Sequence, residues 1–240
     1  WASTCLIKDA SKGSISSYAH VLFLIHYLQR VDPPCVPYLQ HDFRDESTEA
    51  RMVGKWDTYF HVEDPARMGK WSTNEMSVGE LFLGFLDYFA HFDFRNLVVQ
   101  ISRPDRLSKM EKDWNKPLCI EDPFDRSHNL SSGVSKKMFI FIQKTFINSR
   151  NVFHTSAIRK EFLDNNRTEI FRKYKYQHKL LIHMLNACKQ GDPPSDRLCR
   201  ICHCIGHFAE SCPRNNRFKP MRRRNTATQK PSSVAGEHTS

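Results

Sequence analysis

Four residues near the C-terminal end of the sequence have the types and the spacing of a zinc site. In the pattern C-x2-C-x4-H-x4-C they are Cys199, Cys202, His207 and Cys212. Three thiolates and one imidazole make a complete tetrahedral ligand set for structural Zn²⁺, and Gly206 permits the tight turn before the histidine. We therefore expect a zinc knuckle over residues 199–213, in which Cys204 is not needed as a ligand. A chance cluster of thiols, or disulfides, is the alternative.

Positive charge is concentrated around and beyond this motif. The 240-residue chain has a net charge of +10, and residues 197–240 carry nine Lys or Arg against two Glu. Residues 214–240 have no apolar periodicity, so we expect a disordered basic tail. A basic segment beside a zinc knuckle is typical of proteins that bind nucleic-acid phosphates. The candidate phosphate-binding residues are Arg214, Arg217, Lys219, Arg222, Arg223 and Arg224.

Composition narrows the class of protein further. The sequence has no run of about 18 apolar residues and no signal-peptide pattern, so we expect a soluble, cytoplasmic protein without a membrane partner. It begins at Trp1 without a methionine, which suggests a piece of a longer chain. The remaining cysteines lack the spacing of a disulfide framework, and we expect mostly buried, reduced thiols. They are Cys5, Cys35, Cys119 and Cys188.

The rest of the sequence predicts a mainly helical (α+β) body that would carry the knuckle. Residues 16–30 are almost continuously apolar and predict a buried central helix that ends before Pro33. Ser77 and Glu80 form a capping-box pattern at the start of a second helix. Further helices are expected over residues 135–148 and 168–189, with short strands at 56–62 and 96–101. The polar run before Lys116 is expected to be exposed.

These features divide the chain into five parts. They are a helical domain (1–163), a helical arm (164–190), a stiff linker (191–198), the knuckle (199–213) and the tail (214–240).

Several motifs in the body resemble one family. They are Trp1, Gly13 to Tyr18 (GSISSY) at the start of the first helix, Pro33-Pro34 after it, Ser77 to Leu81 (SVGEL), and Ile120 to Asn129 (IEDPFDRSHN). Together with the knuckle, they are similar to the zinc-knuckle terminal uridylyltransferases of the noncanonical poly(A) polymerase group, which tail microRNA precursors and messenger RNAs. The resemblance covers residues 1–153 and 197–213. It implies a poly(A)-polymerase-like central domain with its PAP-associated segment.

The resemblance assigns five residues to UTP binding. Ser17 matches a serine that contacts the phosphates, and Tyr18 matches the tyrosine on which the base stacks. His128 matches the histidine that separates uridine from adenosine, because a ring N–H can donate to uracil O4 but would face an amino donor of adenine or cytosine. Asp122 and Asp125 match acidic positions of the same segment, where they would accept from uracil N3–H, directly or through water, or hold the loop.

Residue types alone support plainer interpretations of the same positions. Ser16 or Ser17 would cap the helix, Tyr18 would belong to the core, and His128 would be a surface or satisfied core histidine. The aspartates would be turn residues.

The resemblance also implies what this sequence lacks. In the family, aspartates of an N-terminal nucleotidyltransferase domain bind Mg²⁺ or Mn²⁺, which activates the RNA 3′ hydroxyl. This sequence has no Asp-x-Asp, so no catalytic residue is assigned and the piece is expected to be inactive alone. The family pattern Trp-Ala-Lys is here Trp-Ala-Ser, with Ser3 in place of a lysine that reaches the triphosphate. Lys8 and Lys12 are candidates to compensate.

Three functions follow as hypotheses. The first is the C-terminal part of an RNA uridylyltransferase that adds UMP from UTP to RNA 3′ ends of microRNA precursors or mRNA, with the knuckle and tail holding RNA rather than DNA. In that case Ile201, Ile205 or Phe208 would contact an unpaired base. The second is a non-catalytic knuckle protein or pseudotransferase that binds RNA. The third, an adenosine-adding relative, is disfavoured by His128.

Overall fold

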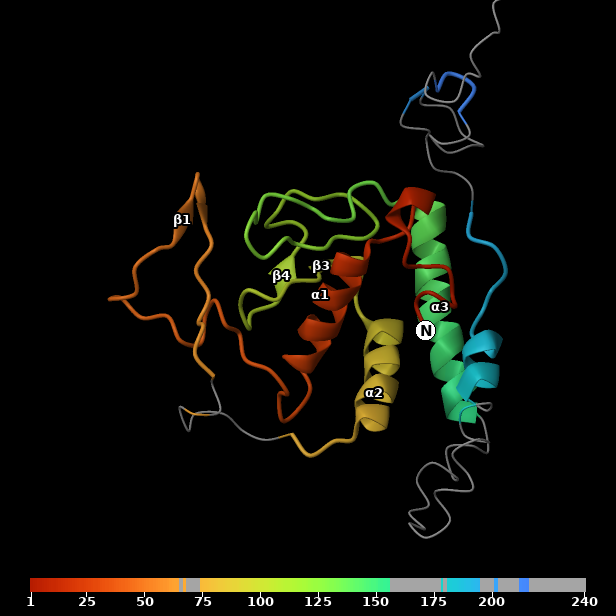
Figure 1. Ribbon diagram of the computed structural model, residues 1–240, viewed down its shortest axis with the longest axis horizontal. Coiled ribbons are helices and arrows are strands. Elements are labelled where there is room, and N and C mark those ends of the chain that lie inside the picture. Colours follow the sequence, from red (N-terminus) through yellow and green to blue (C-terminus); the bar gives the residue numbers. More distant parts are fainter. Residues whose placement is uncertain are drawn as a thin grey trace, which may run out of the picture.

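The computed structural model describes residues 1–64, 67, 74–155, 178, 181–194, 201–202 and 212–215. Within this part the fold is mainly helical, with two small antiparallel sheets (Figure 1). Of the expected divisions, most of the arm, the knuckle and the tail lies outside the described residues. No helix in the described part is long and apolar enough to cross a membrane.

Three helices form the frame. They are α1 (Ser17–Leu28), α2 (Val78–His91) and α3 (Lys136–Thr155). Helix α2 packs against both of the others, and it lies between them in Figure 1. The capping box at its start is confirmed: the Glu80 amide donates to Ser77 Oγ at 3.3 Å, and the Ser77 amide donates to Glu80 Oε2 at 2.7 Å.

Aromatic side chains fill the space between the helices. The rings of Phe23 on α1 and Phe89 on α2 lie 4.5 Å apart, and Phe146 on α3 lies 5.4 Å from Phe89. All three side chains are completely buried. Helix α3 continues beyond the predicted end at Asn148 because Ser149 and Phe153 extend its buried face. The Trp1 indole N–H donates to Ser149 Oγ at 2.7 Å, which fixes the start of the chain to α3.

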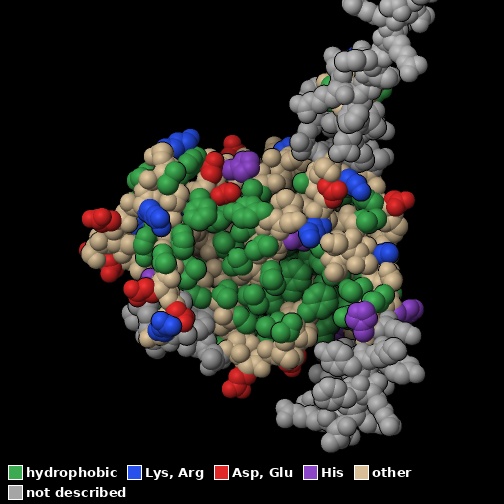
Figure 2. Space-filling view, viewed as in Figure 1, with side chains coloured by type: hydrophobic (Ala, Val, Ile, Leu, Met, Phe, Trp, Pro, Cys, Tyr) green, Lys and Arg blue, Asp and Glu red, His purple; other side chains and the backbone are tan. Residues whose placement is uncertain are grey.

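The uniform burial expected for residues 16–30 is wrong. Tyr18, Val21 and Leu24 are 43%, 52% and 45% exposed, whereas Leu22 and Phe23 are buried. The reason is that α1 packs on α2 and the adjoining loops with one side only. Figure 2 shows hydrophobic side chains gathered over α1 and α2 on one face of the molecule.

The connections contain a short 3-10 helix, η1 (Ala10–Lys12), and four very short strands. Strands β1 (Met52–Val53) and β2 (Trp56–Asp57) form one hairpin, and β3 (Leu97–Val98) pairs with β4 (Leu107–Ser108). The strands predicted at 56–62 and 96–101 therefore exist but are much shorter than expected. An isolated bridge between Val99 and Ile120 joins the second sheet to the motif at 120–129.

The described end of the expected arm packs on the body. Residues 181–187 are helical, and Met184 and Cys188 are buried in the main core. The Asn148 side-chain amide on α3 donates to the Ala187 and Cys188 carbonyls at 3.3 and 3.2 Å.

Buried, reduced cysteines are confirmed at positions 5, 119 and 188, whereas Cys35 is half-buried. Burial raises the pKa of Cys5 to about 11.

The close approach of α1 to α2 depends on Gly84. A Cβ atom at this position would collide with the Tyr27 hydroxyl and lie 3.1 Å from Tyr27 Cζ. We expect Gly84→Ala to lower the free energy of unfolding by about 1–3 kcal/mol, as overpacking of a core does. Urea unfolding measures this.

Gly79 in the same helix is the matched control, because a Cβ there meets only Ser77 Oγ at 3.9 Å. Gly79→Ala should be neutral or stabilising by up to about 1 kcal/mol. Adding Tyr27→Phe to Gly84→Ala should recover part of the loss. Equal stability of the Gly84→Ala and Gly79→Ala variants would contradict the close approach.

Candidate nucleotide-binding site

The N-terminus of α1 presents unused hydrogen-bond donors. Ser16 is the cap, and its hydroxyl accepts from the Ala19 amide at 3.1 Å. Ser17 is therefore not needed as a cap and is exposed, and its hydroxyl has no partner among the described residues. Helix N-termini carry free amides and partial positive charge, an arrangement that suits phosphate oxygens.

Tyr18 lies on the exposed side of α1 and not in the core. Partial burial and then the nearby charge of Asp122 raise the pKa of Tyr18, which places its hydroxyl within electrostatic range of that carboxylate. The ring has enough free surface for a base to stack on it. The structure thus brings together two predicted residues, Tyr18 and Asp122, that lie far apart in the sequence.

The segment 120–130 forms a closed loop. Glu121 and Asn129 make an antiparallel bridge, and the Leu130 amide donates to the Ile120 carbonyl at 2.9 Å. Across the loop, the Asp122 amide donates to the His128 carbonyl at 3.2 Å. The bridge therefore holds both ends of the segment that carries the candidate base-reading residues.

Both aspartates shape this loop with one oxygen each. Asp122 Oδ1 accepts from the amides of Phe124 and Asp125 at 2.9 and 3.0 Å. Asp125 Oδ1 accepts from the amide and the hydroxyl of Ser127 at 3.1 and 2.7 Å. Both aspartates therefore act as turn residues through Oδ1, as residue types alone predict. Within the described structure their Oδ2 atoms make no hydrogen bond.

His128 is at the surface of the loop, beside the backbone of Asp122. Its side chain is exposed, and its ring makes no hydrogen bond to any described residue. The plainer alternative of a satisfied core histidine is therefore excluded. An exposed imidazole with free ring nitrogens can donate one hydrogen bond to a ligand when it is neutral.

An ion pair between a partly buried lysine and a buried glutamate supports the loop from behind, and the residue pattern does not indicate it. Glu121 is almost fully buried and pairs with the Lys112 ammonium, which also donates to the Arg126 carbonyl at 2.8 Å. The Ser102 hydroxyl donates to the other Glu121 oxygen at 3.3 Å. The expectation that the polar run before Lys116 is exposed is thus wrong at Lys112.

The same expectation is also wrong at Lys109. Its side chain is buried, and its ammonium donates to the carbonyls of Lys116 and Pro117 at 2.6 and 3.0 Å. Burial lowers the pKa of Lys109. Both lysines fold back onto carbonyl groups of their own connection, which a pattern of polar residues does not reveal.

Ser3 lines a cavity of about 550 Å³ together with Lys8 and Lys12. It stands at the position of the lysine in the Trp-Ala-Lys pattern described above. The positive charge of Lys8 helps to lower the pKa of His20, after the larger effect of burial, so Lys8 lies within electrostatic range of the first turns of α1. Two exposed ammonium groups therefore lie beside the neutral Ser3. The Lys12 ammonium also lies 3.9 Å from Asp9 Oδ2, and Asp9 and Asp192 line the same cavity, so compensation by Lys8 or Lys12 stays a prediction.

The predicted zinc site is only partly within the described structure. Cys199 and His207 lie outside it, as do all predicted phosphate-binding residues except Arg214. Cys212 is buried, and its sulfur accepts from the Arg214 amide at 3.4 Å, a contact that suits a metal-bound thiolate. The described residues alone contain no group of three or more potential metal ligands. The zinc site therefore stays a prediction.

Comparison with known proteins decides the family. Residues 77–128 match the family model described as Cid1 family poly A polymerase. The chain is 39% identical over 91% of its length to Terminal uridylyltransferase 4 of Mus musculus, and equally identical over the same share to Terminal uridylyltransferase 7 of Homo sapiens. The chain belongs to the noncanonical poly(A) polymerase family. Another relative from this family is human Poly(A) RNA polymerase GLD2, 34% identical over 62% of this chain and 31% of its own.

Solved structures of this family agree with the fold. The Cid1 poly(U) polymerase with magnesium and 3′-dATP superposes with a TM-score of 0.59 at 32% identity, over 65% of this chain and 49% of that one. Cid1 with the UTP analogue UMPNPP gives the same TM-score and identity. The chain spans only 13% and 14% of the two uridylyltransferases.

The ion pair behind the loop yields a prediction. We expect Lys112→Met to lower the free energy of unfolding by about 3 kcal/mol, because it leaves the buried Glu121 carboxylate without a partner. Amide hydrogen exchange at Asp125 and His128 should become faster, because the brace at Arg126 is lost with it. Urea unfolding and exchange mass spectrometry measure the two effects.

Lys116→Met is the control, because Lys116 is exposed and its side chain has no described partner. It should change neither quantity. The double variant Lys112→Met/Glu121→Gln should recover part of the lost stability, since the buried charge is then removed as well. Equal effects of the Lys112 and Lys116 variants would show that the pair does not support the loop.

Proposed function

We propose that this chain is part of an RNA terminal uridylyltransferase that adds UMP from UTP to RNA 3′ ends, and that this part recognises the nucleotide. The proposal is supported by a cluster of three residues: the charge of Asp122 acts on the exposed Tyr18, and the Asp122 amide donates to the carbonyl of the exposed His128 at 3.2 Å. A base stacked on Tyr18 would present its edge to the loop, and the triphosphate would extend toward Ser17, Lys8 and Lys12. Stacking of this kind contributes about 1–3 kcal/mol per base.

His128 supplies the discrimination between bases in this proposal. A ring N–H that donates to uracil O4 meets an acceptor, whereas the amino group of adenine or cytosine presents a second donor. The free Oδ2 of Asp122 or Asp125 is suited to accept from uracil N3–H. In the related Cid1 poly(U) polymerase, structures on UTP selectivity include a histidine-to-asparagine mutant bound to MgATP.

The catalytic metal belongs to another part of the complete protein in this proposal. The Cid1 structures contain magnesium nucleotides, and Mg²⁺ or Mn²⁺ would activate the RNA 3′ hydroxyl and neutralise the pyrophosphate. The described residues here contribute base and phosphate contacts rather than metal ligands. We place the RNA substrates among microRNA precursors or mRNA. We also place the protein in the cytoplasm, in line with a related structure described as a cytoplasmic RNA terminal U-transferase.

Two other functions remain as outcomes of a test. A pseudotransferase would bind RNA without turnover, and Ser3 in place of lysine is the feature that favours it. An adenosine-adding enzyme would resemble the GLD2 relative, and it is disfavoured by His128. Extension of an RNA primer by the full-length protein with UTP or ATP separates the three, because only a uridylyltransferase prefers UTP.

We expect His128→Asn in the full-length protein to lower the ratio of UTP to ATP incorporation at least about tenfold, because the asparagine amide can donate or accept. His41→Asn is the control, since His41 is an exposed histidine on a loop outside the cluster. It should leave the ratio unchanged. An unaltered ratio in the His128 variant would remove His128 from base selection.

The predicted knuckle has a separate role in this proposal, with Zn²⁺ held by Cys199, Cys202, His207 and Cys212 and the basic tail on RNA phosphates. Cys199→Ser or His207→Ala in the full-length protein should lose the bound zinc and weaken RNA binding without altering the choice of UTP over ATP. Cys204→Ser should retain zinc and affinity. Zinc analysis, RNA binding and primer extension measure these effects, and a changed base preference would contradict the division of roles.

A further inference from the structure

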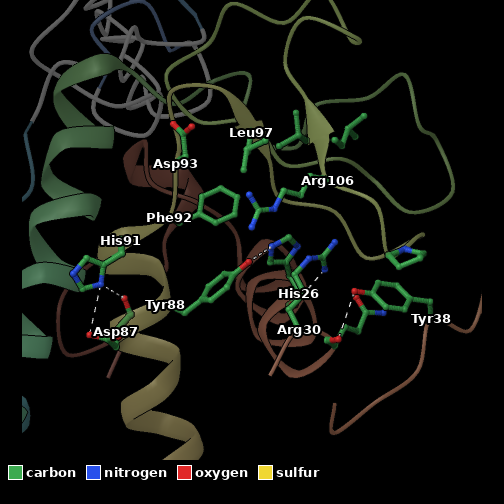
Figure 3. A pocket seen from close by; sticks show the side chains of 14 residues that line it. His26, Arg30, Tyr38, Asp87, Tyr88, His91, Phe92, Asp93, Leu97 and Arg106 are labelled. Atoms are coloured by element: carbon green, nitrogen blue, oxygen red, sulfur yellow. Dashed lines mark hydrogen bonds and ion pairs between the residues drawn. The ribbon is translucent and has the colours of Figure 1, made fainter. Parts of the chain in front are cut away.

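A pocket of about 770 Å³ lies at the other end of α1 from Ser17, between the C-terminal halves of α1 and α2 and the β3–β4 sheet (Figure 3). None of the candidate nucleotide-binding residues lines it. From Ser17 to Leu28 the helix rises about 16 Å, so the pocket is separate from the proposed UTP site. Its volume is in the range of small-ligand sites.

Arg30 brings a positive charge to this pocket and forms no ion pair with a carboxylate of the described residues. Its guanidinium donates to the carbonyls of His26, Gln100 and Arg103 at 3.3, 3.4 and 3.4 Å, all near the upper limit for hydrogen bonds. Burial lowers the pKa of Arg30, and the charge of Arg106 lowers it further. Both arginines line the same pocket.

Arg106 is exposed and makes neither an ion pair nor a hydrogen bond to any residue in the described part of the chain. Figure 3 shows its guanidinium in the pocket near Phe92 and Tyr88, with Arg30 on the far side of His26. An anion in this pocket would find two guanidinium groups that pair with no carboxylate of the described residues, and contacts to them would be charge-assisted.

The acidic residues at the pocket are already engaged. Asp87 Oδ1 accepts from Arg150 Nε at 2.6 Å and lies 3.6 Å from the His91 ring. Asp93 accepts from the backbone amides of Arg95 and Asn96 and from the Asn96 side chain. The two carboxylates are thus held by other donors and do not pair with Arg30 or Arg106.

The remaining wall is aromatic and uncharged. Burial lowers the pKa of His26 to about 3, so its ring is neutral. His26 Nδ1 lies 2.6 Å from the Gln100 carbonyl oxygen, which can only accept, so Nδ1 carries the ring proton. Nε2 is then the acceptor for the Tyr88 hydroxyl at 3.1 Å. This bond fixes Tyr88 beside Phe92, 5.8 Å between ring centroids, and both rings keep some free surface.

We propose that this pocket binds the RNA strand, with one phosphate held by Arg30 and Arg106 and an adjacent unpaired base against Phe92. The proposal rests on RNA being the substrate, as proposed above. Two guanidiniums without a carboxylate partner lie beside a flat apolar wall, and a nucleotide of a single strand can contact both, through its phosphate and its base. An inorganic anion can contact only the guanidiniums, because it has no base to stack on the wall. The pocket holds RNA at a distance from the nucleotide to be added.

The test uses full-length Arg106→Gln, because Arg106 has no described contact on which the fold depends. Binding of a fluorescent oligo(U) RNA, followed by anisotropy over a series of salt concentrations, should weaken about threefold to tenfold. The slope of log K against log salt should become shallower by about 0.7, the value for one phosphate contact with a single strand. The KM for RNA should rise, with kcat and the ratio of UTP to ATP incorporation unchanged.

Arg51→Gln is the matched control, since Arg51 is an exposed arginine outside the pocket and the change in net charge is the same. It should leave the salt slope unaltered. Arg106→Lys should keep the slope but recover only part of the affinity, because an ammonium cannot reproduce the bidentate contact. Excess inorganic phosphate at the same ionic strength should compete poorly with the RNA.

Equal salt slopes for Arg106→Gln, Arg51→Gln and the unaltered protein would overturn the pocket proposal while leaving uridylyl transfer intact. A full-length protein that binds no RNA would overturn the proposed function itself, and the pocket proposal with it. A change in UTP preference in Arg106→Gln would also overturn the proposal, because it would place Arg106 at the nucleotide site.

Discussion

The packing of Phe23, Phe89 and Phe146 holds the three helices of this domain together. Each ring comes from a different helix, and none of the three is accessible to water. Such rings bury large apolar areas and make oriented contacts with one another. Because Phe23 lies in the middle of α1, this contact fixes both ends of that helix. The proposed nucleotide contacts lie at one end and Arg30 follows the other, so the geometry of both candidate sites depends on one aromatic core.

The loop at 120–130 shows a different kind of constraint. Its shape comes from side-chain oxygens that accept backbone amides, and its position comes from the buried charge of Glu121. The loop can therefore present an exposed imidazole without a helix or a strand beneath it. Preorganisation of this kind lowers the entropy lost when a ligand is bound.

Sequence reasoning succeeded where the determinants are local. The capping box of Ser77 and Glu80 follows from the spacing of two residues within one helical turn, and the structure confirms it. The candidate residues of the nucleotide site came from the resemblance, and the structure brings Tyr18 and Asp122 together. The exposed side of α1 was missed because an apolar sequence does not show which neighbours are present.

Long-range pairs were beyond prediction for a related reason. Lys112 and Glu121 lie nine positions apart in a stretch of mixed polarity, and nothing local selects this partner among many charges. The pocket lined by Arg30 and Arg106 is formed by α1, α2 and the connection between β3 and β4, so it exists only in the folded chain. Patterns of residue type along one segment cannot reveal either feature.

The Lys112–Glu121 pair also has a consequence for the evolution of this domain. A neutral residue at either position alone leaves a charge buried behind the loop, whereas neutral residues at both positions leave none. The two positions are therefore expected to change together among relatives. A transfer of the loop from one relative to another would carry Glu121 but not Lys112. The loop and its candidate base-reading residues would then arrive without the lysine that pairs with Glu121.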